Sequence, residues 1–493
     1  MNFKYKSAHM NGPGKPGTAV FLLEGDQTLE GRPEIASFRR CLTPLMAGGV
    51  YKGGYLEGAS LFLAEEEIWL AVTGLGKASE LNEARLVEAG ADAATRLGAT
   101  GLKEAFVALP PLEGLSPAKV MELIATGARL ALDRHPGYRS QPPSAPSLAT
   151  LTLQHLGSKD PVEKPQQSIG RADVLARAQL EARRLSDMPP NMLYPESFAE
   201  EAKRVALKHK LRISVWESEK IAFEGAGGLL SVGAGSRRPP LLVILEYPGK
   251  STSLPPTALV GKGVTFDSGG LCLKSGEGML YMKSDMSGAA IVLATLAAAA
   301  ELRLPGPLVG VMPLAENMPG GGAYRPGDVV SMLSGQMVEV VNTDAEGRMV
   351  LADAIAVAQK FKPARLIDIA TLTGACQVAL GPLMAGLFAN DDGLADEIAA
   401  AGRAVGEDFW RLPLYDPYEE EIKSEIADFR QSGSRFGAAI NAALFLRRFV
   451  KPPLPWAHLD IAGPGRRLKK CPSCPEGASG FGTRTLLKLL MAE

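Results

Sequence analysis

Short apolar runs rich in Val, Ile and Leu recur from residue 211 onward, and helical segments separate several of them. The runs lie at residues 211–216, 241–246, 257–266, 308–314, 338–342 and 365–370. Continuous apolar strands that alternate with helices are typical of parallel sheets covered on both faces. The pattern therefore predicts an α/β domain with a mostly parallel central sheet flanked by helices. Ligands of such sheets bind beyond the carboxyl ends of the strands.

The first 150 residues show the same class of pattern on a smaller scale. Strand-like segments and one amphipathic helical run alternate at residues 18–23, 68–72, 78–97 and 105–109, and polar stretches follow at 140–147 and 157–167. A chain of 493 residues exceeds the size at which a single core stops growing. We therefore expect two domains. Residues 1–166 would form a smaller N-terminal α/β domain with an oligomeric or regulatory role, and residues 167–493 the catalytic domain, including a linking helix at 171–187.

The charge of the chain is balanced, with 53 Lys and Arg residues against 54 Asp and Glu residues. A chain with balanced charge has no net positive potential that would attract nucleic acid or an anionic membrane surface. Small neutral or mixed-charge substrates therefore fit better. The first residues lack the apolar core of a secretory signal. The longest apolar stretch, 288–300, is too short to cross a bilayer and is typical of a core helix. We expect a cytoplasmic protein.

The five cysteines are an odd number and do not suggest a disulfide framework. Only Cys471 and Cys474 have metal-like spacing. A zinc knuckle needs two more soft ligands, and none stands nearby in the sequence. A plain surface loop is the favoured interpretation of this pair, with an occasional redox bridge as the alternative.

Two segments place polar residues where apolar runs end. The first spans residues 260–274 and continues to 281–285, and the second spans 341–348; each has the pattern of a strand, a loop and the start of a helix. A single Asp before a helix is usually a cap, a single Lys is usually solvated, and a Gly pair is usually a turn. Their concentration at strand ends favours a functional site.

The acidic residues of these segments predict a metal site. They are Asp267, Asp285, Asp344 and Glu346. Four negative charges brought together destabilise a fold unless cations neutralise them, and two divalent ions would balance them. Two such ions can bind a carbonyl oxygen and activate water near neutral pH. Because none of the five histidines lies in either segment, the ligands would be oxygen-rich, which leaves zinc, manganese, cobalt and magnesium open.

The spacing of these residues restricts how they can meet. In an extended segment Asp344, Glu346 and Arg348 would project from one face, so we expect extended backbone there. Lys262 and Asp267 would converge only if the chain bends, and neighbouring glycines allow that.

Two cations remain for catalysis. Lys274 could donate to the oxyanion of a tetrahedral intermediate. Arg348, next to a helix N-terminus, could hold a small anion such as bicarbonate as a base.

The segment 342–348, Asn-Thr-Asp-Ala-Glu-Gly-Arg, is identical to the NTDAEGR signature of the leucyl aminopeptidase family, the hexameric two-metal exopeptidases. Residues 184–195, 317–319, 325–328, 371–375 and 456–463 resemble further landmarks of the family in the same order. The resemblance therefore spans about 185–465, whereas the N-terminal domain is similar only in pattern.

The resemblance implies two divalent ions, expected to be manganese or zinc, on a ligand set shared between them. Lys262, Asp267, Asp285 and Glu346 would bind the tighter ion, and Asp267, Asp344 and Glu346 the other. Lys262 would then be a neutral amine, which requires a strongly lowered pKa. The resemblance also implies that Lys274 polarises the carbonyl and that Arg348 holds bicarbonate.

For the substrate, the resemblance implies an N-terminal residue that is bulky and apolar, such as leucine. The pocket for its side chain would be lined by Met282, Thr371, Leu372 and Ala462. Coordination of the free amine would limit attack to the terminal peptide bond. The implied assembly is a homohexamer. The chain departs from the family pattern at Gly320, 433–437 and 464–480, which affects side-chain preference and subunit contacts rather than reaction class.

Two other functions stay open at this point. Carboxylate-rich dinuclear sites also cleave phosphate esters, so a two-metal phosphoesterase is the second enzyme hypothesis. A DNA-binding accessory role of the oligomer is the non-enzyme hypothesis, and the balanced charge argues against it as the main role.

Overall fold

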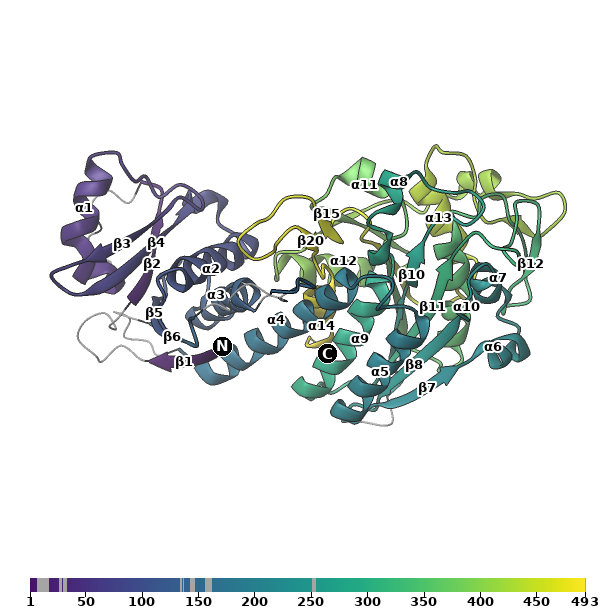
Figure 1. The fold of residues 1–493 in the computed structure, drawn as a ribbon, viewed down its shortest axis with the longest axis horizontal. Helices are drawn as coiled ribbons and strands as arrows, with labels where there is room; N and C mark the ends of the chain where they lie inside the picture. Colours follow the sequence, from purple (N-terminus) through teal and green to yellow (C-terminus); the bar gives the residue numbers. More distant parts are fainter. Residues whose placement is uncertain are drawn as a thin grey trace. The chain divides into compact units, whose positions relative to one another are not determined.

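The computed structural model describes residues 1–6, 17–25, 29, 33–133, 135, 137–141, 147–155, 162–250 and 254–492. The chain forms two compact units (Figure 1). Unit 1 comprises residues 1–180 and 469–476, and unit 2 comprises residues 181–468 and 477–493. The polar residues 142–146 and 157–161, near which a domain boundary is predicted, lie outside the described residues.

The two units divide within the long helix α4 (Pro165–Asp187). The predicted boundary at 166/167 lies at the start of this helix instead. The physical reason for the difference is packing, because Ile169, Ala172 and Ala176 belong to the hydrophobic core of unit 1. The first part of α4 therefore belongs to unit 1 and its end to unit 2.

Unit 1 contains a six-stranded sheet. Its order is β1 (Asn2–Lys6), β6 (Thr150–Gln154), β5 (Glu104–Ala108), β2 (Gly17–Leu23), β4 (Ile68–Gly76) and β3 (Gly58–Leu63). All neighbouring strands are parallel except β3 and β4. The strands predicted at 18–23, 68–72 and 105–109 are β2, β4 and β5, so the α/β class is confirmed for this unit.

Helices cover both faces of this sheet. Along β2, Ala19 and Phe21 pack with α2 (Glu83–Gly98) and α3 (Pro117–Leu132). The alternate residues Val20 and Leu22 pack with η1 (Pro33–Phe38) and α1 (Arg39–Ala47). Because successive strand residues point to opposite faces, the two helix groups lie on opposite sides of the sheet.

Unit 2 is built on a nine-stranded mixed sheet. Its order is β16 (Asp408–Arg411), β15 (Met384–Ala389), β18 (Trp456–Asp460), β14 (Arg365–Ala370), β9 (Thr257–Gly261), β11 (Leu308–Asn317), β8 (Leu241–Tyr247) and β7 (Arg212–Trp216), with β10 (Gly263–Asp267) paired to β11. The central strands β18, β14, β9 and β11 run parallel. Antiparallel pairs join β8 to β11 and to β7, and β15 to β18.

The helices around this sheet fall into two packed groups (Figure 1). One group contains α5 (Pro195–His209), α9 (Ser287–Leu302), α12 (Asp392–Arg403) and α14 (Thr483–Leu490). The other contains α7 (Gly227–Gly233), α10 (Glu346–Gln359), α11 (Gly374–Leu380) and α13 (Ala438–Arg447). Strands β9, β14 and β18 between them are buried almost throughout. This is the flanked central sheet that the apolar runs predict.

Smaller elements complete unit 2. They are α6 (Ser218–Glu224), α8 (Gly276–Met279), η3 (Met282–Ser284), η4 (Asp416–Ile422), a sheet of β12 (Val329–Ser331), β13 (Met337–Glu339) and β17 (Phe429–Arg430), and the pair β19 (Arg466–Arg467) and β20 (Gly477–Ala478). The apolar run at 338–342, predicted as a strand of the central sheet, instead contributes to β13 in the small sheet.

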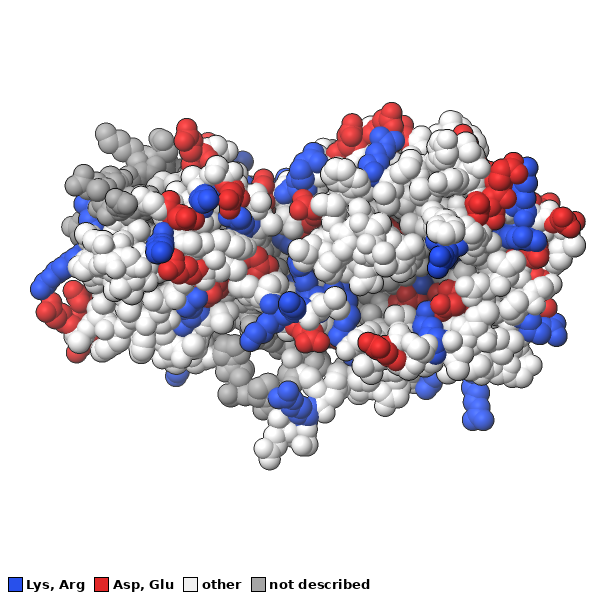
Figure 2. Space-filling model, turned by 90° about the horizontal axis from the view of Figure 1, so that it is seen from above, with Lys and Arg blue, Asp and Glu red and all other residues white. Residues whose placement is uncertain are grey.

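One stretch, Gly276–Leu302, is long and apolar enough to cross a membrane, yet 78% of its apolar window is buried inside the protein. Within it, α9 is the buried core helix predicted over 288–300. Figure 2 shows acidic and basic side chains interspersed over the face that it draws.

The cysteine pair at 471 and 474 lies in unit 1 and forms a tight turn. Cys471 N donates to Cys474 O at 2.8 Å, and Cys474 N donates to Cys471 O at 3.1 Å. The Glu88 carboxylate accepts a hydrogen bond from Ser473 N at 3.0 Å. Since Cys474 is buried, the expectation of a plain surface loop is wrong for this residue.

Candidate metal centre

Lys262 lies between β9 and β10, which both pair with β11. Strand β9 pairs with β14 and β11, and after Lys262 strand β10 continues along β11 as far as the pair Asp267 and Asn317. Lys262 N donates to Ile369 O at 3.1 Å, and Lys262 O accepts from Ala289 N at 2.8 Å. The register along β11 shifts between Val264 and Phe266, and this β-bulge, rather than a bend at Lys262, lets Lys262 and Asp267 face a common site.

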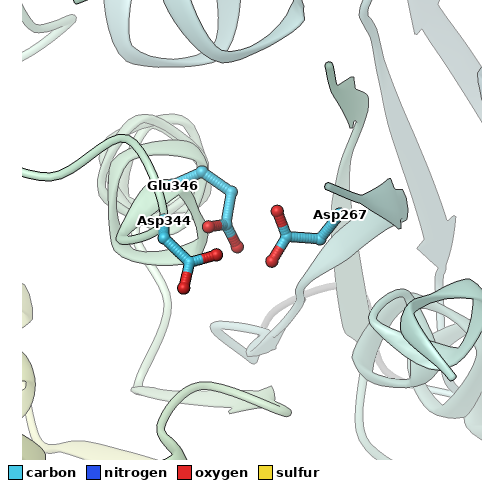
Figure 3. Close-up of side chains that lie close together, drawn as sticks. All are labelled: Asp267, Asp344 and Glu346. Carbon is cyan, nitrogen blue, oxygen red and sulfur yellow. The ribbon is translucent and has the colours of Figure 1, made fainter. Parts of the chain in front are cut away.

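Three carboxylates converge at the end of β10 and the start of α10. Asp267, Asp344 and Glu346 each offer one oxygen, and these oxygens lie within 4.8 Å of one another. Figure 3 shows Asp267 facing the other two across a small gap. Asp267 and Glu346 are each 2% exposed, and Glu346 Oε2 is buried without a hydrogen-bond partner. A buried acceptor of this kind fits a bound cation, because a buried charge needs a partner.

Lys262 and Asp285 form a second part of the site. Lys262 Nζ lies 2.8 Å and 2.7 Å from the two oxygens of Asp285 and 2.9 Å from Glu346 Oε1. All three side chains are buried. An ideal Cβ on Gly347 would lie 2.5 Å from Lys262 Cε, so glycine at 347 leaves room for the lysine. Asp285 therefore joins the three carboxylates through Lys262 and not as a direct member of their cluster.

Lys274 lies on the other side of the carboxylates. Its Nζ is 2.9 Å from Asp267 Oδ2 and 2.5 Å from Asp344 Oδ1. The loop that carries it is fixed to the strand end, because Lys274 N donates to Ser268 O at 2.9 Å. The two predicted lysines thus bracket the acidic cluster.

The electrostatics of the site follow from burial. Burial, reinforced by Glu346, raises the pKa of Asp267 to about 6. Burial also raises the pKa of Asp285 and of Asp344. For Glu346 burial acts in the same direction, but Lys262 and Lys274 outweigh it and lower its pKa. Several crowded carboxylates share only two lysine cations here. Divalent ions would stabilise such an arrangement.

Burial lowers the pKa of a lysine, and for Lys262 the carboxylates of Asp285, Glu346 and Asp267 outweigh that effect and raise it. For Lys274, too, neighbouring carboxylates outweigh burial and raise the pKa. The neighbouring carboxylates therefore favour the charged form of both lysines.

Helix α10 begins at Glu346, so the expectation of extended backbone from Asp344 to Arg348 is wrong. Asp344 and Glu346 still converge, because Asp344 lies in the turn before the helix. Arg348, in the first helical turn, donates from Nη1 to Gln431 O at 2.8 Å. Burial lowers the pKa of Arg348 to about 10. Its guanidinium is therefore held by the backbone carbonyl of Gln431.

Uncharged residues hold the acidic loops in place. None of them is among the site residues predicted above. Asn317 Nδ2 donates to Asp267 Oδ1 and to Thr343 O, at 2.8 Å and 2.9 Å. Thr343 Oγ1 donates to Gly269 O at 2.7 Å, and Tyr324 Oη donates to Thr343 O at 2.8 Å. The sequence signal that could have identified Asn317 is its position, because a polar residue at the end of a buried strand often belongs to a ligand site.

The four predicted pocket residues lie in segments tied to the same site. Thr371 Oγ1 donates to Asp285 Oδ1 at 2.8 Å, and Met282 O accepts from Asp285 N at 3.3 Å. Leu372 N and Ala462 N both donate to Asp460 Oδ1, each at 3.1 Å. Asp460, which was not predicted as a site residue, joins the two pocket segments.

Comparisons with known proteins agree over nearly the whole chain. A model of the cytosol aminopeptidase family, catalytic domain, matches residues 180–487, and a model of its N-terminal domain matches residues 20–142. A probable cytosol aminopeptidase of Roseiflexus castenholzii is 45% identical over 420 residues, 85% of this chain and 86% of that protein. The one from Nitratidesulfovibrio vulgaris is 41% identical over 482 residues, 96% and 95% of the two chains.

Solved structures resemble the fold over its full length. A mutant of tomato leucine aminopeptidase matches with a TM-score of 0.90 and 30% identity, covering 100% of this chain and 97% of that one. The bottromycin maturation enzyme BotP in complex with Mn matches with a TM-score of 0.85 and 34% identity, covering 97% and 99%. With the two family models and these relatives, the chain belongs to the cytosol aminopeptidase family, peptidase family M17.

Proposed function

We propose that this protein is a leucyl aminopeptidase that removes a bulky apolar first residue from peptides with the help of two divalent cations. The observation that carries the proposal is the convergence of Asp267, Asp344 and Glu346 within 4.8 Å beside the buried Lys262. Membership of the aminopeptidase family supports the reaction class. BotP, a relative of the fold, is described in complex with Mn, which supports manganese as one candidate ion.

The ligands that we propose for the two ions are Lys262, Asp267, Asp285, Asp344 and Glu346. When bound, such ions supply Lewis-acid polarisation of the carbonyl and lower the pKa of water. Lys262 and Lys274 now occupy the neighbourhood of the carboxylate oxygens. When metal ions are bound, each lysine would give up part of these ion pairs. Lys262 would then serve as a metal ligand, and Lys274 would face the substrate.

Lys274 and Arg348 are the residues to which we assign catalytic roles. Lys274 extends over Asp267 and Asp344 at the open side of the cluster, where it is 18% exposed. A donor there can stabilise charge that develops on the carbonyl oxygen of the substrate. Arg348, at the start of α10, could hold bicarbonate that accepts a proton, since its helix N-terminus also favours an anion.

Chelation is the test of this function. Dialysis against excess chelator should abolish hydrolysis of Leu-p-nitroanilide, and addition of Mn²⁺, Zn²⁺ or Co²⁺ should restore it. Full turnover in excess chelator after long dialysis would contradict the proposal. A nitrophenyl phosphate run in parallel distinguishes the phosphoesterase alternative, which predicts turnover of the phosphate ester and no need for a free amine.

We also propose that the chain assembles as a homohexamer, on the basis of its family membership. Light scattering coupled to size-exclusion chromatography should give a mass six times that of the chain. A monomeric mass at micromolar concentration would contradict this assembly.

A further inference from the structure

Gln431, a buried glutamine to which the proposed function assigns no role, contacts the segment that carries two of the acidic residues. It follows β17, and its N donates to Glu339 O at 3.0 Å, which continues the pairing of β17 with β13. Its side-chain Oε1 accepts from Val341 N at 2.7 Å and from Asn342 N at 3.1 Å. Gln431 is 0% exposed, so water does not reach its side chain. One buried side-chain oxygen therefore fixes the backbone that leads into the acidic loop.

Asn342 connects this contact to Asp344. Asn342 Oδ1 accepts from Asp344 N at 2.9 Å, and Asn342 O accepts from Ala345 N at 3.1 Å. Asp344 is therefore held in the turn before α10 by an asparagine whose own N–H is bonded to Gln431. Without the glutamine oxygen, the N–H groups of Val341 and Asn342 would lose this partner, and the backbone before Asp344 would be less fixed.

The same glutamine also holds the other end of the segment. Arg348 Nη1 donates to Gln431 O at 2.8 Å. The segment is thus attached to Gln431 on both sides of Asp344 and Glu346. Oxygens of the three-carboxylate cluster lie within 4.8 Å of one another, where like charges repel. Attachment of the backbone to Gln431 opposes the separation that this repulsion favours.

Gln359 provides a comparison with a glutamine that holds backbone far from the acidic residues. Its Oε1 accepts from Lys451 N at 2.8 Å, and its Nε2 donates to Phe449 O at 2.8 Å. It is the last residue of α10, whereas Glu346 is the first. Loss of the Gln359 side chain should therefore lower the stability of the fold alone. Loss of the Gln431 side chain should also change ion binding, because the backbone that it holds carries a proposed metal ligand.

We propose that Gln431 is a positioning residue that sets the affinity of the divalent ion bound by Asp344. This proposal rests on the two-metal function above and adds to it a residue that acts through Asn342 and Asp344. Among the proposed ligands, Asp267 and Glu346 are shared by the two ions, whereas Asp344 belongs to the weaker ion alone. The effect of Gln431 should therefore fall on the weaker ion.

The test measures Mn²⁺ binding to the metal-free full chain by calorimetry, in parallel with hydrolysis of Leu-p-nitroanilide. Gln431→Met keeps the length of the side chain and removes its amide oxygen. The Kd of the weaker ion should rise about tenfold or more, whereas the Kd of the tighter ion should stay within about threefold of the wild-type value. Turnover should recover as Mn²⁺ saturates the weaker site, because occupancy follows mass action.

Gln359→Met is the matched control, because it removes the same group from a backbone contact at the opposite end of α10. It should lower the Tm and leave both Kd values within about twofold of wild type. Gln431→Glu keeps a side-chain oxygen and should restore most of the affinity for the weaker ion. Asn342→Ala, at an exposed position, removes the oxygen that binds Asp344 N and should weaken the same ion; it replaces Gln431→Met if that variant does not fold.

Wild-type Kd values in Gln431→Met, or in Asn342→Ala where it replaces that variant, would overturn the positioning role and leave the aminopeptidase function intact. Equal weakening of both ions, or an equal loss in Gln359→Met, would also overturn it, because a general loosening of the fold would then explain the result. A wild-type chain that binds no Mn²⁺, or that hydrolyses no Leu-p-nitroanilide when loaded, would instead overturn the proposed function itself. The two failures are therefore distinguishable.

Discussion

Glu346 is the residue that touches both parts of the candidate centre. One of its oxygens lies 2.9 Å from Lys262 Nζ, and the other is buried without a hydrogen-bond partner. Glu346→Gln keeps the size of the side chain and removes its charge. We expect kcat/KM for Leu-p-nitroanilide to fall on the order of a hundredfold or more, with a matching loss of bound metal, because even residues behind metal ligands have effects near this size.

The control for this variant is Glu301→Gln, at the exposed end of α9. It changes the same functional group far along the chain from the cluster and should leave kcat/KM and metal content unaltered. A folded Glu346→Gln protein with wild-type turnover would show that the candidate centre is not the site of chemistry.

Asp353 is a second buried carboxyl group, and it controls stability rather than chemistry. It accepts hydrogen bonds from Leu229 N and Leu333 N, each at 2.9 Å. Burial raises its pKa from 3.8 to about 7, and these backbone donors oppose the shift. The folded state therefore holds the proton more tightly than the unfolded chain does. This contribution to stability is complete below about pH 4 and is lost as the pH rises through about 7.

Asp353→Asn should remove this dependence on pH. The Tm of the variant minus the Tm of the wild type should increase between pH 5 and pH 8, measured by calorimetry in the presence of chelator. Since all other groups are common to the two proteins, the difference isolates residue 353. A difference in Tm that stays constant over this range would show that Asp353 is ionised in the folded protein throughout.

At the scale of elements, Thr343 connects the two loops that carry the acidic residues. Its hydroxyl donates to Gly269 O at 2.7 Å and accepts from Cys272 N at 2.8 Å. Thr343→Val removes the partner of the buried Gly269 carbonyl oxygen and of the half-buried Cys272 N–H, and the loss costs about 1–3 kcal/mol for a fully buried group. We expect metal affinity and kcat/KM to fall about tenfold or more. Thr343→Ser, which keeps the hydroxyl, should restore most of both, and equal losses in the two variants would argue against the hydrogen bonds as the cause.

Strand β18 carries a carboxylate that joins the two segments of the proposed pocket. Asp460 accepts from Leu372 N and Ala462 N at 3.1 Å, and its other oxygen accepts from Thr373 Oγ1 at 2.7 Å. Asp460→Ala should release both pocket segments and lower the ratio of kcat/KM for leucine over alanine p-nitroanilide at least about threefold. The exposed Asp408→Ala in β16 is the control. If Asp460→Ala lowered turnover of both substrates equally, Asp460 would act on folding and not on pocket shape.

For the whole molecule, local patterns in the sequence predicted the elements better than their pairing. The runs at 241–246 and 365–370 are both strands, because an apolar segment bounded by turns leaves few alternatives. Yet β8 pairs antiparallel with β11, whereas β14 is parallel to both of its neighbours. Both strands are buried on both faces, so their side chains carry the same signal and give no sign of direction.

In the candidate site, too, some features could be predicted from the sequence and others could not. The grouping of Asp267, Asp344 and Glu346 could be predicted from their charge, because carboxylates that share one site need cations. A shared sheet edge is not the reason, since the run before Asp344 forms β13 of a separate small sheet. The contact between Asp285 and Lys262 could not, since Asp285 follows the separate turn η3 and meets Lys262 only in the tertiary structure. Asn317 and Thr343 lie within the landmark segments 317–319 and 342–348, but the argument from charge gives them no role, because they are uncharged.

We propose that the acidic residues of unit 2 hold two divalent cations that are required for turnover. The decisive experiment is metal analysis of the purified protein, combined with titration of the metal-free protein against Mn²⁺ and parallel measurement of Leu-p-nitroanilide hydrolysis. Activity should rise with metal content and level off at two ions per chain. Full activity in protein that carries no divalent ion would contradict the account.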